Sequence, residues 1–163
     1  MIVSLSFLSS CQKKNVVTDT VNSLTEFDMP YTTTLAVPPQ SVITNNTYTN
    51  QSPPFATNSA SVYSNYKTST DLITSMAMTQ VNLTTDGPNL DFVKSYSIYI
   101  QATGLEDALV ASKSNIPVGS KSIESDVTNV NLIPYINKDK ISLMMVSSGG
   151  GTVAGQTLTL KTN

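Results

Sequence analysis

The chain has 163 residues, a formal net charge of −2 and charged side chains at 12% of its positions. This length suits one domain, and so sparse and balanced a charge provides no basic surface for nucleic acid. The sequence has no His, no Arg and no Trp, whereas Ser and Thr together number 44. Histidine is the commonest general base and metal ligand at neutral pH, and arginine is the usual bidentate clamp for phosphate and carboxylate. We therefore expect neither an enzyme nor a protein with a cofactor.

A short apolar run from Ile2 to Leu8 begins the chain and ends in Leu8-Ser9-Ser10-Cys11, which holds the only cysteine. A branched apolar residue, two small residues and a cysteine resemble the lipobox of bacterial lipoproteins. The resemblance implies that residues 1–10 are a signal peptide, cut before Cys11 once the thiol carries a diacylglyceryl group. The segment departs from the usual signal because no Lys or Arg precedes the apolar run. The alternative is a buried N-terminal strand with an incidental cysteine.

Residues 11–26 are polar and predict a lipidated tether that lifts a domain off the membrane. The apolar run before Cys11 is too short for a spanning helix, which needs about twenty apolar residues, so we expect an anchored protein. Gln12 follows the cysteine, at the position where an aspartate would resemble an inner-membrane retention signal. The absence of that aspartate favours the outer membrane and leaves the periplasmic or surface face open. Asp19-Thr20-Val21 resembles the short O-glycosylation motif of Bacteroidota, with Thr20 as the acceptor. A plain linker explains the same residues.

The remaining residues, 27–163, predict a single folded domain made of strands. In its first part, β-prone and alternating residues are separated by prolines, which cannot donate to a strand ladder. The elements that we expect here are a strand over 31–37, a brief strand at 42–43, a long loop over 44–61, a helical turn over 61–67 and a strand over 73–83 with a bulge near residue 80.

The second part has clearer alternation, because Tyr96, Ile98 and Ile100 face one way and polar residues face the other. The elements that we expect after that strand are a returning strand over 109–111, a strand end leading into a short helical turn over 127–136, and a final hairpin of 141–146 against 153–161 with a flexible tip at 147–151. In the last strand, Leu158 and Leu160 are expected to point inward.

Strands at about ten-residue spacing, separated by Gly, Pro and Asn turns, are typical of a two-sheet antiparallel sandwich. No long helical pattern separates the strands, so a parallel βαβ fold is not expected. The sequence therefore predicts an all-β sandwich, immunoglobulin-like or jelly-roll-like, with short helical turns only.

Three oxygen-bearing residues, Asp86, Asn89 and Asp91, surround Gly87 in a predicted turn. Hard oxygen ligands at such spacing can hold Ca²⁺, although the full EF-hand spacing and its terminal Glu are missing. A turn in which Asp and Asn cap the backbone explains the same pattern.

Two pairs of acidic residues, Glu106-Asp107 and Glu124 with Asp126, could serve glycoside hydrolysis if two carboxylates faced each other across a cleft. Residues 124 and 126 are expected to share one strand face, which fits solvent exposure equally well. Four tyrosines are candidates for an exposed contact surface, with half-buried strand positions as the favoured explanation: Tyr48, Tyr63, Tyr66 and Tyr99.

Taken as a whole, the sequence predicts a lipid-anchored lipoprotein of the cell envelope that acts as a binding or accessory module. In its signal and composition it resembles the small envelope lipoproteins of Bacteroidota. The expected partners are the membrane, through the anchor, and a protein or a glycan, but not nucleic acid. The alternatives are a structural subunit of an envelope or fimbrial assembly, whose edge strands accept a partner strand, and a carboxylate-based glycan hydrolase.

Overall fold

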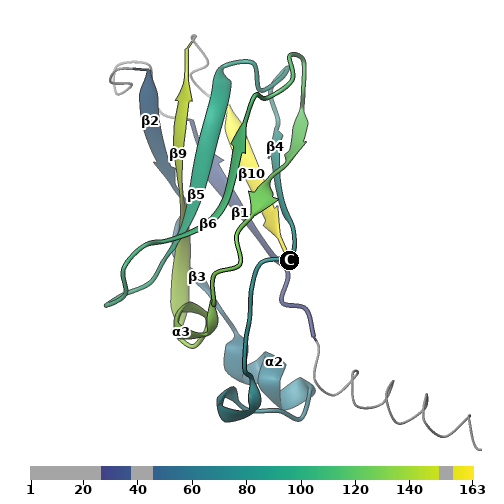
Figure 1. The fold of residues 1–163 in the computed structure, drawn as a ribbon, viewed down its shortest axis with the longest axis vertical. Coiled ribbons are helices and arrows are strands. Elements are labelled where there is room, and N and C mark those ends of the chain that lie inside the picture. The colour runs from purple at the N-terminus through teal and green to yellow at the C-terminus, as the bar shows by residue number, and fades with distance from the viewer. Residues whose placement is uncertain (1–26, 38–45, 151–155) are drawn as a thin grey trace, which may run out of the picture.

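The computed structural model describes residues 27–37, 46–150 and 156–163, and these residues form one β-sandwich of two antiparallel sheets (Figure 1). The predicted signal peptide, the tether and the brief strand at 42–43 lie outside the described residues. The all-β sandwich expected from the sequence is confirmed. The sheets are not closed into a barrel, so each keeps two edges.

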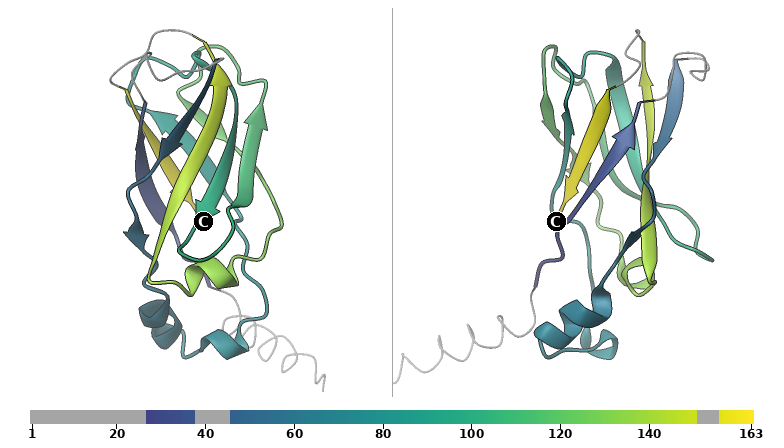
Figure 2. Two further views of the ribbon diagram at one scale, coloured as in Figure 1. Left: turned by 90° about the vertical axis from the view of Figure 1, so that its left-hand side faces the viewer. Right: turned by 180° about the vertical axis from the view of Figure 1, so that it is seen from behind.

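One sheet has four strands in the order β1-β10-β4-β7. Its strands are β1 Tyr31–Ala36, β10 Thr157–Thr162, β4 Val81–Thr85 and β7 Ser122–Glu124. The first described strand therefore pairs with the last one, and Leu35 lies opposite Leu158. This pairing fixes both ends of the described chain in one sheet (Figure 2).

The other sheet has the order β2-β9-β5-β6-β8, with β3 also pairing with β9. Its strands are β2 Thr47–Gln51, β9 Lys140–Gly149, β5 Val93–Gln101, β6 Ala108–Ser114, β8 Asp126–Val127 and β3 Phe55–Ala56. The long strands β5 and β9 lie in the middle, where the alternation of Tyr96, Ile98 and Ile100 places all three side chains in the core. The predicted inward face of this strand is confirmed.

The core lies between the two sheets and consists of apolar side chains from alternate strand positions. Its most buried members, all at most 1% exposed, are Leu35, Leu83, Leu158 and Leu160 from one sheet and Ile98, Ile100, Leu143 and Met145 from the other. Burial of one such side chain contributes about 1.5–3 kcal/mol, so this layer is the main source of stability.

A single buried residue, Ser125, joins the two sheets at the β7–β8 corner. Its amide donates to the Val81 carbonyl at 2.8 Å, and its hydroxyl lies 2.8 Å from the Tyr96 hydroxyl. Glu124 and Asp126 on either side of it therefore belong to different sheets. The expectation that these two carboxylates share one strand face is wrong, because the chain changes sheets between them.

Helical structure is limited to short pieces in the described residues, as expected. These are α2 Ser59–Asn65, the 3₁₀ turn η2 Thr70–Leu72 and α3 Ile133–Ile136. Figure 1 shows α2 below one end of the sandwich, with the chain after it rising toward β4. The residues after η2, 73–80, form no strand and cross this end of the sandwich; we call them the strap.

Three sequence expectations are wrong. The strand predicted over 73–83 is formed only by Val81–Thr85, because the strap has no neighbouring strand to pair with. The loop predicted over 44–61 contains β2 and β3, which pair with β9. The predicted final hairpin does not form, because β9 and β10 lie in different sheets, and Ser147–Gly149 belongs to β9 and not to a hairpin tip.

Candidate functional site

An apolar cleft lies at the α2 end of the sandwich, with a volume of about 900 Å³. This size lies within the range of about 300–1,000 Å³ for sites that bind small molecules. Its lining comes from four parts of the fold: the entering chain, the β3–α2 region, the strap and the lower ends of the core strands. The apolar residues of this lining are Phe27, Met29, Tyr31, Phe55, Leu72, Ile73, Met76, Ala77, Met78, Ile100, Leu132, Ile136, Ile141 and Leu143.

The cleft has a solvent-open mouth and a closed floor. The floor residues Ile100 and Leu143 are at most 1% exposed, whereas Met29, Ile73 and Met76 are half-buried. Leu72, on η2, is 71% exposed. An apolar group can therefore contact the mouth residues directly, whereas Ile100 and Leu143 have almost no surface open to solvent.

The strap is held over the cleft at two points. The Met76 carbonyl accepts from the Leu132 amide at 2.7 Å, and the Met76 amide donates to the Asn131 side chain at 3.4 Å. Toward β4, the amide and hydroxyl of Thr79 donate to the Asn163 carbonyl at 2.6 and 3.0 Å. Gln80 and Asn163 also exchange backbone hydrogen bonds, at 3.1 and 2.9 Å. Residues 73–78 have no strand partner, and segments of that kind belong to the less stable part of a fold.

An aromatic cluster fixes the entering chain against α2. The Phe27 ring stacks on the Tyr66 ring at a centroid distance of 4.9 Å and meets the Tyr63 ring edge-on at 5.9 Å. Such pairs add about 0.5–1.5 kcal/mol beyond the burial of their area. Phe27 therefore lines the cleft and also contacts the cap, by which we mean α2 and its flanking residues, 57–66.

Hydrogen bonds connect the cap to the sandwich. The Tyr31 hydroxyl donates to the Thr57 carbonyl at 2.6 Å, and the Thr57 hydroxyl donates to the Lys138 carbonyl at 2.6 Å. The Tyr63 hydroxyl donates to the Asn137 side chain at 3.1 Å. These bonds join β1, β3, α2 and the turn before β9, so the rear wall of the cleft is better fixed than the strap.

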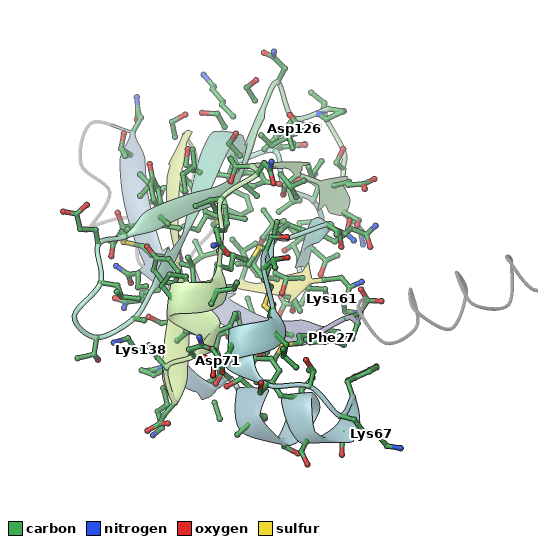
Figure 3. All side chains as sticks on the ribbon, turned by 60° about the horizontal axis from the view of Figure 1, so that its bottom comes forward. Phe27, Lys67, Asp71, Asp126, Lys138 and Lys161 are labelled. Atoms are coloured by element: carbon green, nitrogen blue, oxygen red, sulfur yellow. The ribbon has the colours of Figure 1, made fainter. Side chains whose placement is uncertain are left out.

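The cleft offers little for acid–base chemistry at neutral pH. Burial raises the pKa of Tyr31 to about 12, with the charge of Tyr63 adding to the shift. Burial also raises the pKa of Tyr63. Both phenols therefore stay protonated and act as hydrogen-bond donors. The charged residues of the described lining are Asp28 and Lys67, both exposed, and Figure 3 shows Lys67 pointing outward at the end of α2.

The three residues predicted to hold Ca²⁺ lie around the β4–β5 turn, where each side chain accepts a hydrogen bond from the backbone. Asp86 accepts from the Thr157 amide at 2.8 Å, and Asn89 accepts from the Asp91 amide at 3.2 Å. Asp91 accepts from the Gly119 amide at 2.6 Å. These contacts are those of the alternative, in which Asp and Asn cap turns. In the described residues no group of three His, Cys, Asp or Glu side chains is placed to hold a metal ion.

The predicted carboxylate pairs are spread over the fold. Glu106 and Asp107 lie in the turn between β5 and β6, where Asp107 accepts from the Gln101 side chain at 2.7 Å. Asp126 forms an ion pair with Lys113 at 2.9 Å, on the side of the domain far from α2 and Lys67 (Figure 3). The structure does not bring these four residues into the cleft.

The four tyrosines that were candidates for an exposed contact surface divide into two groups. Tyr48 and Tyr63 are 5% exposed, because β2 and α2 turn them inward, so neither belongs to such a surface. Tyr66 is 41% exposed and Tyr99 is half-buried. Cys11 and Thr20 lie outside the described residues.

Sequence reasoning did not find the cleft, although one signal was present. Met76 and Met78 alternate with small and polar residues, a pattern that predicts a half-buried strand. A strap over an open core end buries the same alternate positions without a strand partner. The contribution of Phe27 and Met29 carries no signal in the sequence, since it depends on where the chain enters the fold.

No protein-family model matches this chain, and no curated protein matches it. Among the helices of the described residues, none has the length and apolar character needed to cross a bilayer. The described residues thus form an antiparallel β-sandwich with an apolar cleft at the end where the chain enters.

Proposed function

We propose that this protein is a lipid-anchored β-sandwich of a bacterial cell envelope, held through Cys11, and that it acts as a binding or accessory module. Leu8-Ser9-Ser10-Cys11 supports the anchor. The observation that supports a binding role is the apolar cleft of about 900 Å³ at the chain's point of entry. The outer membrane is the proposed location, and the face of that membrane stays open.

The position of the cleft agrees with an anchored protein. Fifteen residues, 12–26, separate Cys11 from Phe27. A chain of that length spans at most about 50 Å when extended, and a flexible one averages about 20 Å between its ends. Because Phe27 is part of the cleft wall, an anchor at Cys11 keeps the cleft close to the membrane surface.

Assembly through strand addition has less support at the short strands β7, β8 and β3 than at the edge strands β1 and β2, which have six and five residues. β7 has three residues, β8 two and β3 two. The longest edge strand, β1, has six, and the carbonyl of its Ala36 already accepts a hydrogen bond from the Asn50 side chain. Short and occupied edges are the usual protection against strand pairing between molecules.

A hydrolase also has less support. Retaining or inverting hydrolysis of a glycoside needs two carboxyl groups about 5–9.5 Å apart across a substrate site. Among the described residues that line the cleft, one has a carboxylate side chain, Asp28. Glu124 and Asp126 belong to different sheets, and Asp126 is paired with Lys113.

Metabolic labelling tests the proposed function. The native sequence is expressed in a Gram-negative host that is fed an alkyne fatty acid, and the protein is then probed for the label in membrane fractions. We expect label in the native protein and in Ser10→Ala, which keeps a small residue, and none in Cys11→Ala. Equal labelling of Cys11→Ala, or no label in the native protein, would contradict the anchor.

A surface reagent then separates the two faces. An impermeant amine-reactive probe is applied to intact cells and to lysed cells, since most lysines of the described residues are exposed. Modification in intact cells identifies the outer face, and modification only after lysis identifies the periplasmic face.

A further inference from the structure

We propose that the cleft binds an acyl chain of a membrane phospholipid, which enters between η2 and the entering chain and displaces the strap. This inference deepens the proposed function and rests on it for the source of the ligand.

The shape and chemistry of the lining favour a long, flexible apolar ligand. The mouth is lined by half-buried apolar side chains, and the floor by aliphatic core residues from α3, β5 and β9. Three methionines, Met29, Met76 and Met78, contribute to the lining. Methionine side chains are unbranched and polarizable, so they adapt to ligands without a fixed shape. The polar residues of the lining are mostly exposed: Asp28, Lys67, Thr68, Thr74, Ser75, Thr79, Thr162 and Asn163.

The exposed Leu72 marks the entry. It is 71% exposed at the mouth of the cleft, although it is apolar. Its neighbour Ile73 is half-buried and continues the apolar surface into the cleft. An acyl chain that lies along Leu72 and Ile73 would cover the Leu72 side chain, which the fold leaves in water. Burial of this apolar surface is favourable by the usual hydrophobic effect.

The strap provides the movement that the closed floor requires. Between Ile73 and Met76 the backbone of the described structure has no secondary structure, and Met76 is fixed mainly through Asn131 and Leu132. The opposite wall is fixed by the bonds of Tyr31, Thr57 and Tyr63. Movement of residues 74–76 breaks the two hydrogen bonds of Met76 and leaves those of Thr79 and Gln80 to Asn163 in place.

The position at which the polypeptide enters the fold supports the membrane as the source of the acyl ligand. The predicted anchor precedes Phe27, and Phe27 lies in the cleft wall and packs on the cap. An anchored domain thus presents this end, with exposed Leu72, toward the lipid that surrounds its own anchor. Asp28 and Lys67 place one charge of each sign at the mouth, so the mouth suits a zwitterionic head group more than a singly charged one.

The test uses the full chain carrying Cys11→Ser, so that no covalent lipid competes and the result does not depend on processing. The methionine methyl groups are labelled with ¹³C, and a zwitterionic lysophospholipid is added below its micelle concentration. We expect the NMR signals of Met29, Met76 and Met78 to shift, while those of Met144 and Met145 on β9 stay unchanged. Equal shifts at all five positions, or no shift at any, would overturn the proposal.

A matched pair of variants checks the entry. Leu72→Asp places a charge at the mouth, and Val118→Asp places one at a more open position, 91% exposed, outside the cleft lining. Because both side chains are in water, neither change is expected to unfold the domain. Loss of the Leu72 contact is expected to weaken binding by about tenfold, whereas Val118→Asp binds as the parent does. Equal weakening by both variants would refute the proposed entry.

The ligand arms separate the sources. A free fatty acid of the same chain length is titrated beside the lysophospholipid, and vesicles of a zwitterionic phospholipid test transfer from a bilayer. Binding of the fatty acid alone would overturn the membrane source. Because Cys11 is absent throughout, a failed titration leaves the labelling result for the anchor untouched, and the two proposals are tested separately.

Discussion

Gly149 is the position where the packing of the larger sheet can be tested most sharply. It is the last residue of β9 and lies opposite Val93 at a point where the β5–β9 register shifts. A Cβ atom built on Gly149 would lie in severe overlap with the Phe92 carbonyl oxygen, 2.9 Å from the Phe92 carbonyl carbon and 3.1 Å from the Val93 Cα. All three atoms are backbone, so no side-chain rotation can relieve the contact.

The expected cost of Gly149→Ala follows from these contacts. Overpacking of a tight interior costs about 1–3 kcal/mol. Separating the strands also weakens the hydrogen bond from the Gly149 amide to the Asn46 carbonyl, 2.9 Å long, which is worth about 1 kcal/mol. We expect a loss of about 2–4 kcal/mol in the free energy of unfolding.

The neighbouring glycine is the control. A Cβ on Gly150 would meet no atom within 4 Å, so Gly150→Ala is expected to change stability by about 0–1 kcal/mol in the favourable direction. Urea unfolding followed by circular dichroism gives both values, with the midpoint shifted and the slope unchanged. Equal midpoints for the two variants would refute the close approach of β9 to β5.

Three further predictions concern the cleft, the buried phenols and the turns. Phe27→Ala removes the stack on Tyr66. Because one to two aromatic pairs are lost, amide hydrogen exchange in α2 should speed up by about tenfold while exchange in β5 is unchanged. Unchanged exchange in α2 would contradict the stabilising role of the Phe27 contacts. Stability in urea should fall as the pH rises from 10 toward about 12. Tyr31 and Tyr48 have a pKa of about 12 in the fold against 10.0 when unfolded, so the native state keeps protons that the unfolded state loses. A stability that does not change over that pH range would count against the burial of these two phenols. Asp91→Ala removes the acceptor of the Gly119 amide and should cost about 1 kcal/mol with or without added Ca²⁺; a stabilisation by Ca²⁺ that the variant loses would instead support an ion site.

The parts of the fold with strong alternation could be predicted from the sequence. Ile98 and Ile100 in β5, and Leu143 and Met145 in β9, recur at every second position, with Tyr99 and Met144 between them. This period of two places one face in the core, and the structure buries all four side chains. Leu158 and Leu160 follow the same rule in β10.

Sheet membership could not be predicted in the same way. Residues 141–146 and 153–161 look like two arms of a hairpin, because a turn-like glycine run separates them. Alternation states which face of a strand is buried, but it does not state which strand lies beside it. In the structure β9 pairs with β2 and β5, whereas β10 pairs with β1 and β4.

The candidate site was hidden for a related reason. Met76 and Met78 have the spacing of a strand, yet they cover the open end of the core in an unpaired segment. The cleft exists only where the entering chain, α2 and the strap meet, and contacts between such distant residues leave no local pattern. The sequence predicts an anchored binding module, but it contains no local pattern that predicts the position of the cleft.

The central claim is that a lipid at residue 11 holds this sandwich to a bacterial membrane. Intact-mass spectrometry of the protein extracted from membranes of its native cells tests that claim directly. The account predicts a chain that begins at Cys11 and carries the added mass of a diacylglyceryl group, with or without a further acyl chain. A chain that retains residues 1–10 and an unmodified thiol would contradict it.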